Sequence, residues 1–121
     1  MGESARTIAV IDDDLRVLES LVNFLASCGY KAEGYCSALQ FLSGDGLSKS
    51  VCIVTDVEMP AMSGLELLRY VRSVNSPVPV VIITGKPPEN SEAFYLERGA
   101  IGFFRKPVDG DALVDLIKSV C

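Results

Sequence analysis

Five side chains that could carry out chemistry each follow a short apolar stretch: Asp12, Asp13, Asp56, Thr84 and Lys106. Carboxylates ~4 Å apart repel by about 4 kcal/mol at an effective dielectric constant near 20, so a cluster of them needs a cation or a proton. With only oxygen ligands and no histidine in the chain, the expected cation is Mg²⁺, or a similar hard ion such as Mn²⁺. The Thr84 hydroxyl and the Lys106 ammonium suit an anion beside that metal, as phosphoryl transfer requires. Asp56 would then be the nucleophile and form an aspartyl phosphate.

Each of these residues also has an ordinary structural explanation. An Asp after a strand often caps the next turn, so Asp56 taken alone is ambiguous. Thr84 can close a turn, and Lys106 can simply be solvated. The acids, the hydroxyl and the ammonium favour chemistry only if the fold brings them to one place, so the elements that carry them decide the matter.

Apolar stretches rich in β-branched residues predict five strands, of which the first, third and fourth are typical of strands buried on both faces. They cover residues 7–11, 31–35, 51–54, 79–83 and 101–104. Apolar residues at helical spacing and capping residues predict a helix after each strand. The expected caps are Asp14, the capping boxes at 37–40 and 63–66, Asn90 or Ser91, and Asp109.

The predicted apolar faces show how two of these helices should pack. In the helix after Ser63, we expect Leu65, Leu68 and Val71 to share a face, with Leu67 and Val74 alongside. In the last helix we expect Leu113, Leu116, Ile117 and Val120 to lie on one side. Between residues 37 and 44 a single short helix through Phe41 and Leu42 is expected.

Alternating strands and helices predict an α/β fold, a doubly wound, flavodoxin-like parallel sheet with five helices. Right-handed crossovers favour the strand order 2-1-3-4-5, and the more polar second strand suits an edge of that sheet. In this order the first, third, fourth and fifth strands end at the same edge of the sheet. Three carboxylates, a hydroxyl and an ammonium would therefore gather there, where open α/β sheets place their ligand sites.

Composition limits the class of protein. A chain of 121 residues with 49% hydrophobic and 22% charged residues is typical of one soluble globular domain. The formal charge of −5, without a basic run, argues against direct nucleic-acid binding. No apolar run is long enough to span a membrane, and the first residues lack a signal peptide's apolar core, so we expect a cytoplasmic protein.

The four cysteines do not predict a metal site or a disulfide framework. Cys28, Cys36, Cys52 and Cys121 have no paired spacing, and a cytoplasmic domain would not be expected to contain disulfides. Cys52, within the third apolar stretch, is interpreted as a small core residue.

Four segments resemble the signature of the response-regulator receiver domain, the CheY-like domain of two-component signalling. They are Val10–Asp14, Thr55–Pro60 with Ser63 and Gly64, Ile82–Gly85, and Phe103–Pro107. The resemblance covers residues 6–120 and implies one receiver domain over 1–121. The Thr84-Gly85 pair and the helix containing Phe41 and Leu42 resemble the nitrogen-fixation and nitrate-response class of regulators. In that class a DNA-binding domain usually follows, which would lie outside this chain.

The resemblance implies a role for each matching position. Asp56 would accept a phosphoryl group from the phosphohistidine of a sensor kinase, and Thr84 and Lys106 would bind the phosphate. Asp13, Asp56 and the backbone carbonyl of Glu58 would ligate Mg²⁺, with Asp12 assisting through ordered water. The resemblance also implies that the Lys106–Pro107 peptide bond is cis.

The same resemblance implies how the phosphate would be read and lost. Movement of Thr84 toward the phosphate would leave space that Phe103, at the aromatic switch position, could fill, changing a surface for homodimerisation or output. Glu58 and Lys86 depart from the best-known single-domain members of the family. They should flank the path of the hydrolytic water, and an ion pair between them would slow or speed dephosphorylation.

Two other classes of protein remain open. A haloacid-dehalogenase-like phosphatase also uses a strand-end Asp, Mg²⁺, a hydroxyl and a Lys, but Glu58 replaces its acid–base Asp and no cap domain is present. A flavodoxin-like flavin carrier has the same fold, but its first loop must bind a phosphate, which three successive acids at 12–14 would repel. The intact set of site residues argues against a signalling-inactive receiver.

Overall fold

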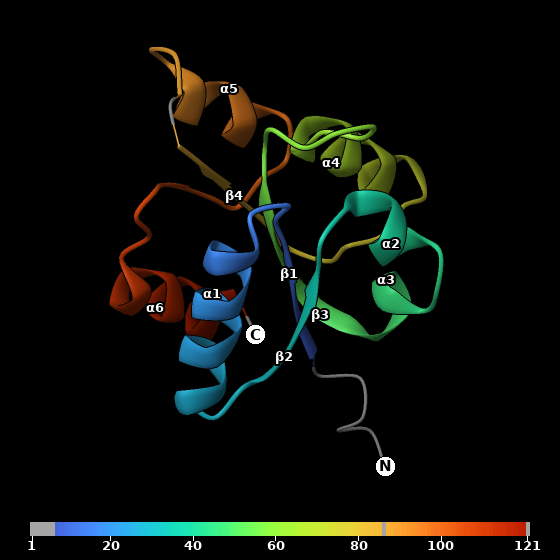
Figure 1. Ribbon diagram of the computed structural model, residues 1–121. Helices are drawn as coiled ribbons and strands as arrows, with labels where there is room; N and C mark the ends of the chain where they lie inside the picture. The colour runs from blue at the N-terminus through green and yellow to red at the C-terminus, as the bar shows by residue number, and fades with distance from the viewer. Residues whose placement is uncertain (1–6, 86, 121) are drawn as a thin grey trace.

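The chain folds into one five-stranded sheet with helices on both faces (Figure 1). The computed structural model describes residues 7–85 and 87–120. The strands are β1 Thr7–Ile11, β2 Lys31–Tyr35, β3 Ser50–Asp56, β4 Val80–Thr84 and β5 Gly102–Arg105. The helices are α1 Leu15–Ser27, α2 Ala38–Leu42, α3 Gly46–Lys49, α4 Gly64–Ser73, α5 Ser91–Glu97 and α6 Gly110–Val120.

The sheet has the predicted topology. All four strand pairings are parallel, and the order is β2-β1-β3-β4-β5. Strands β1 and β4 are buried along their whole length, whereas edge strand β2 is exposed or half-buried throughout. The difference follows from position, because an edge strand has a neighbour on one side only and tolerates polar side chains.

Two hydrophobic cores fill the space between the sheet and its helices. Successive strand residues point to opposite faces. On one face, the side chains around Val10 and Cys52 pack against α1 and α6. On the other, those around Ile11 and Ile53 pack against α2 and α4, where Phe41 is fully buried. The interpretation of Cys52 as a core residue is confirmed.

Several helices begin at the residues that the sequence predicts. The Asp14 carboxylate accepts a hydrogen bond of 3.0 Å from the backbone N–H of Arg16. At the start of α4, the Glu66 N–H donates to Ser63 Oγ at 3.1 Å and the Ser63 N–H donates to Glu66 Oε1 at 2.9 Å. This is the expected capping box, and Asp109 caps α6 in a similar way. These caps set where each helix leaves the sheet edge.

The prediction of five helices is wrong, because the described residues form six. The chain between β2 and β3 makes two short helices, α2 and α3, instead of one. Gly46 lies against the ring and carbonyl of Phe41, so closely that a Cβ would clash with them. A larger residue would not fit at position 46, and the second helix begins there, directly against the buried Phe41 ring.

Smaller differences concern the helix ends. Val74, predicted alongside the apolar face of α4, is 45% exposed at the C-cap, and Val120 is 37% exposed in the last turn of α6. Asn90 occupies the N-cap position of α5 with a left-handed φ of 64°, and its side chain makes no capping hydrogen bond. The Ser91 hydroxyl instead donates to the Pro88 carbonyl at 2.6 Å. Helix ends depend on local turns, which apolar spacing does not report.

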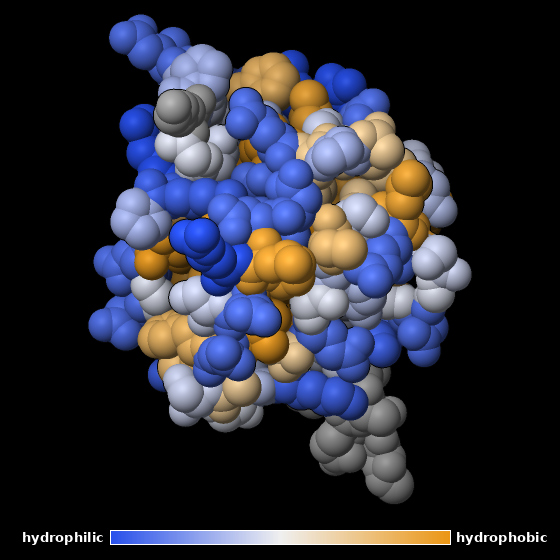
Figure 2. Space-filling view, in the orientation of Figure 1, coloured by the Kyte–Doolittle hydropathy of each residue, from blue (hydrophilic) through white to orange (hydrophobic). Residues whose placement is uncertain are grey.

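The surface mixes polar and apolar residues. Figure 2 shows hydrophilic residues over one face with hydrophobic residues between them. Leu15 in α1 and Phe94 in α5 are among the exposed large apolar side chains. Within the described residues, no helix has the length and apolar character needed to cross a membrane.

Candidate functional site

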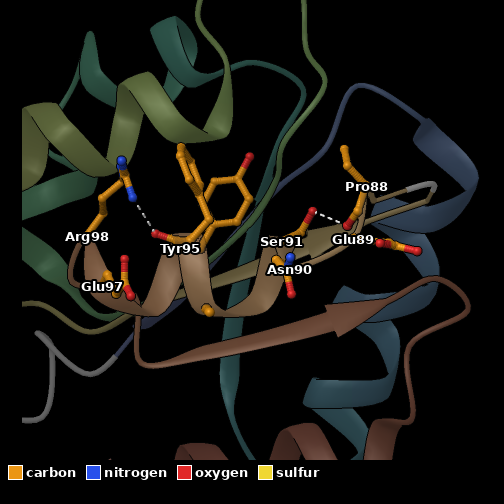
Figure 3. A pocket seen from close by; sticks show the side chains of 9 residues that line it. Pro88, Glu89, Asn90, Ser91, Tyr95, Glu97 and Arg98 are labelled. Carbon is orange, nitrogen blue, oxygen red and sulfur yellow. Dashed lines mark hydrogen bonds between the residues drawn. The ribbon is translucent and has the colours of Figure 1, made fainter.

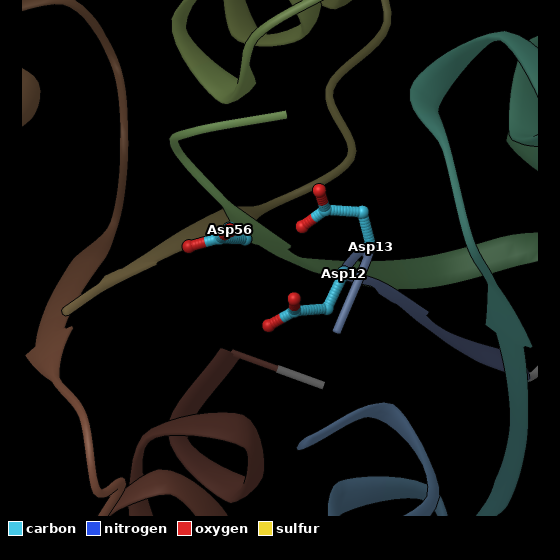
Figure 4. A group of neighbouring side chains, drawn as sticks. All are labelled: Asp12, Asp13 and Asp56. Carbon is cyan, nitrogen blue, oxygen red and sulfur yellow. The ribbon is translucent and has the colours of Figure 1, made fainter. Parts of the chain in front are cut away.

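The carboxyl ends of β1 and β3 bring three acids together. Ile11 pairs with Thr55 in the β1–β3 register, so the following residues, Asp12 and Asp56, emerge side by side. One carboxylate oxygen from each of Asp12, Asp13 and Asp56 lies within 4.8 Å of the others (Figure 4). Asp12 and Asp56 are buried, whereas Asp13 is exposed. The predicted gathering of acids at this edge of the sheet is present in the structure.

Lys106 places a cation between the two buried acids. Its ammonium lies 2.9 Å from Oδ2 of Asp12 and 3.2 Å from Oδ1 of Asp56. Within the described part of the chain, Oδ2 of Asp12 makes this ion pair but no hydrogen bond of good geometry. The Lys106 N–H donates to the Thr84 carbonyl at 2.9 Å, which aligns the end of β5 with that of β4. The Lys106–Pro107 peptide bond is cis, as the resemblance implies.

In the described part of the site, the electrostatics reflect acids crowded around the Lys106 ammonium. Burial, followed by the negative charge of Asp12, raises the pKa of Asp56, although Lys106 opposes this. Burial alone would lower the pKa of Lys106, but its contacts with Asp12 and Asp56 outweigh burial and raise that pKa. The raised pKa of Lys106 favours its charged form. Burial and the charge of Asp12 destabilise the ionised form of Asp56, and a second cation would offset this.

Thr84, Phe103 and Glu58 lie on β4, on β5 and in the loop after β3, respectively. Thr84 ends β4 and is buried, next to the strand residue that pairs with Asp56. Phe103 is half-buried in β5, and its ring stacks on that of Tyr95. Glu58 is exposed in the loop after β3. Lys86 lies outside the described residues, so its predicted role beside Glu58 stays a prediction.

Helix α4 begins close to the backbone of the site. The Gly64 N–H donates to the Val57 carbonyl at 2.9 Å, and a Cβ on Gly64 would clash with the carbonyl oxygen of Asp56. Only glycine permits this approach. The short connection from Asp56 to α4 is thereby held against the end of β3.

The three carboxylates fit a hard divalent cation. They supply only oxygen ligands, which is the donor set that Mg²⁺ and Mn²⁺ prefer. Among the described residues, the two buried acids share the Lys106 ammonium, which offsets only part of their negative charge. Asp13, the exposed member, leaves the cluster open on the solvent side.

Tyr95 is a residue near the site that reasoning from the sequence did not single out. Burial and the negative charge of Glu58 raise its pKa, which places the hydroxyl in the electrostatic field of the loop after β3. The sequence offered one signal for Tyr95, because it lies four residues after Ser91 in the short helix predicted there. The stacking on Phe103 depends on the packing of α5 against β5, which spacing alone does not specify.

The fold and the acidic site together define a CheY-like α/β domain, and comparisons with known proteins agree. The family model of the response regulator receiver domain matches residues 8–118. The chain is 33% identical over 119 residues to the response regulator protein TodT of Pseudomonas putida, covering 98% of this chain and 52% of TodT. It is 37% identical over 113 residues to the transcriptional regulatory protein FixJ of Bradyrhizobium diazoefficiens, covering 93% and 55%.

A solved structure gives the same answer. The crystal structure of FixJ-N has a TM-score of 0.83 and 29% sequence identity, with 95% of this chain and 92% of that chain covered. The chain therefore belongs to the response regulator receiver domain family of two-component systems. It spans about half the length of these two curated relatives.

Proposed function

We propose that this chain is a phosphoacceptor in which Asp56 takes a phosphoryl group from the phosphohistidine of a sensor histidine kinase. One observation carries the proposal. The buried Asp56 carboxylate lies 3.2 Å from the Lys106 ammonium and within 4.8 Å of two further acids that suit a divalent cation. A nucleophile, a fixed positive charge and a metal-binding cluster in one place are what phosphoryl transfer needs.

In the proposed transfer, a carboxylate oxygen of Asp56 attacks phosphorus. The bond from phosphorus to the imidazole nitrogen breaks, and its electron pair stays on that nitrogen. The Lys106 ammonium compensates the charge on the phosphoryl oxygens, and the Thr84 hydroxyl donates a hydrogen bond to one of them. Mg²⁺ or Mn²⁺, when bound by Asp13, Asp56 and the Glu58 backbone carbonyl, would neutralise further phosphoryl charge. Asp12 contributes to that site through water and holds Lys106 in place.

The proposed output uses Thr84 and Phe103. Phosphorylation adds roughly −1.5 to −2 charge and three acceptor oxygens within reach of Thr84. Movement of Thr84 toward them leaves room for Phe103, which has no hydroxyl and so switches by packing alone. The resulting surface around α5 and β5 would support a phosphorylation-dependent homodimer. Phe103→Ala should keep phosphorylation intact but weaken association of the phosphorylated protein, and unchanged association in sedimentation would remove Phe103 from this role.

The lifetime of the phosphate is proposed to depend on Glu58 and Lys86. Both residues would flank the path of the attacking water, and an ion pair between them would change access to the phosphate. Exposed ion pairs are weak, so the expected effect is a change of a few-fold. To test this role of the pair, autodephosphorylation rates of Lys86→Ala and Glu58→Gln are compared with that of the parent. Equal rates in all three proteins would show that the pair does not affect the lifetime of the phosphate.

A separate output domain would carry the signal further. FixJ is named as a transcriptional regulatory protein, and this chain matches about half of it. We propose that the natural partner of this domain is a DNA-binding domain in a longer regulator. The acidic receiver, with its formal charge of −5, would not bind the nucleic acid directly.

Intact-mass measurement with acetyl phosphate and Mg²⁺ tests the phosphoacceptor directly. The expected result is one phosphoryl adduct on the parent and none on Asp56→Asn. Asp14→Asn is the matched control, because Asp14 is exposed and an asparagine can still cap α1. This variant should form as much phosphoryl adduct as the parent. An adduct that persists in Asp56→Asn would disprove the assignment. Repeated turnover of a phosphate ester would instead support the phosphatase.

A further inference from the structure

Helix α5 is joined to the sheet by few of its own side chains. Ser91 is buried and Tyr95 is half-buried, while the other members are exposed: Glu92, Ala93, Phe94, Leu96 and Glu97. Tyr95 is thus the one large side chain of α5 that packs inward, where it joins Phe103 against the hydrophobic core on that face of the sheet. Figure 3 shows Tyr95 among the side chains that line a cavity along α5. The attachment of α5 depends strongly on this one side chain.

Tyr95 connects the switch position to the surface of α5. Its ring stacks on Phe103 with centroids 5.9 Å apart and an interplanar angle of 23°. It also makes an edge contact with Phe94 at 5.1 Å and 83°. The Arg98 guanidinium carbon lies 3.6 Å from the centroid of Phe94. Four side chains therefore run in contact from β5 to the exposed side of α5.

The C-terminal end of α5 is bonded to α4 and to the start of the chain that leads into β5. At the C-terminal end, the Arg72 guanidinium of α4 donates to the Gly99 carbonyl at 2.9 Å, and the Ala100 N–H donates to the Tyr95 carbonyl at 3.1 Å. Alongside the helix lies an open surface cavity of about 520 Å³, lined by residues from Pro88 to Arg98. The C-terminal end of α5 is therefore tied to α4, while the cavity is a hollow along the surface of the helix itself.

We propose that Tyr95 is a positioning residue for Phe103: its ring holds Phe103 in the half-buried position before phosphorylation and transmits inward rotation of Phe103 to α5. This inference rests on the phosphoacceptor function proposed for Asp56. Inward rotation of Phe103 separates the two rings, so the stack opposes switching in the resting protein. Once the stack is broken, α5 loses its main inward contact and can move about its anchored end.

Amide hydrogen exchange of α5, with and without phosphorylation, measures this coupling directly. In the parent, phosphorylation should speed exchange of the α5 amides. The energy of an aromatic stack corresponds to about a two- to twelve-fold change in the ratio of closed to open α5. The α5 amides of unphosphorylated Tyr95→Leu should therefore already exchange faster than in the parent by about that factor. Phosphorylation should then add little. Tyr95→Phe keeps the ring and should behave as the parent, which a role for the hydroxyl would not predict.

Controls keep the possible failures distinct. Tyr70→Leu makes the same substitution at an exposed position of α4 and should leave exchange of α5 unchanged. Intact mass is recorded for every variant, and Tyr95→Met replaces Tyr95→Leu if the latter does not fold. No adduct on the parent overturns the phosphoacceptor and this inference together. Two results overturn this inference alone when the phosphoryl adducts are normal. One is amide exchange of α5 in Tyr95→Leu equal to that of the parent, and the other is no effect of phosphorylation on α5 exchange in the parent.

Discussion

The ammonium of Lys106 lies nearer to Asp12, at 2.9 Å, than to Asp56, at 3.2 Å. Asp12 is fully buried, so this pairing is well shielded from solvent. Lys106 is therefore held at the end of β5 by a residue that does not itself accept a phosphoryl group in the proposed reaction. The positive charge is in place before any phosphate arrives, and no reorganisation is needed to supply it.

Replacement of Lys106 by Met should destabilise the protein, because Asp12 and Asp56 would lose their shared cation. We expect a loss of about 2–4 kcal/mol in the free energy of unfolding at neutral pH, measured by urea denaturation. The pKa of Lys106 is raised, so its contribution is fully present below its ordinary pKa of 10.5 and is lost as pH rises through the folded value. The gap between parent and variant should accordingly narrow above pH 10.5.

Lys118→Met is the matched control, since Lys118 is exposed in α6 and should change stability by less than about 0.5 kcal/mol. A stability for Lys106→Met equal to that of the control would mean that the ion pairs contribute nothing.

Replacement of Asp56 by Asn should stabilise the metal-free protein at neutral pH. Burial and the charge of Asp12 raise the pKa of Asp56, so its ionisation costs stability that an uncharged amide of the same shape does not. The expected gain is about 1 kcal/mol, the size of a typical point-mutation effect. The cost is absent below the ordinary pKa of 3.8 and develops as pH rises through and above it. Thermal unfolding from acid to neutral pH should show the gain disappearing on the acid side; a constant gain would contradict this origin.

Mg²⁺ should stabilise the parent more than any variant that lacks one of the clustered carboxylates. A ligand that binds only the folded state at ten times its Kd adds about 1.4 kcal/mol. Asp13→Asn should abolish this gain without loss of the fold, because Asp13 is exposed. Melting temperatures across a Mg²⁺ titration provide the measurement. Asp14→Asn, one residue further along, should retain the full response, and an equal loss in both variants would point to nonspecific screening.

Arg72→Met should destabilise the end of α4. The Arg72 guanidinium donates to three carbonyl oxygens, of Ser76, Val78 and Gly99, at 2.9–3.1 Å. Their loss leaves partly buried acceptors unsatisfied, for which we expect about 2 kcal/mol in urea denaturation. Arg69→Met, exposed on the same helix, should be close to neutral. If both substitutions have the same small effect, the bridge from α4 to Gly99 is not a stabilising feature.

The sequence by itself determined the sheet and which acidic side chains meet at its edge. The sequence alternates strand-length apolar runs with capped helices. The right-handed crossover rule allows few strand orders for such a chain, and the observed order is 2-1-3-4-5. That order brings the ends of β1, β3, β4 and β5 to one edge, so the meeting of Asp12, Asp13, Asp56 and Lys106 follows from topology. Local signals agreed with the global fold, as the caps at Asp14 and Ser63 illustrate.

Only the tertiary structure decided which charged and aromatic side chains are in contact. Whether Lys106 pairs with Asp12, Asp56 or both depends on ångström-scale placement of strand ends, which residue spacing does not report. The extra helix α3 begins at Gly46, which packs against the Phe41 ring, and the periodicity of apolar residues does not report this contact. The stack of Tyr95 on Phe103 likewise joins a helix to a strand through packing. Local patterns encode which face of an element is buried, whereas the partner on that face is selected by the whole fold.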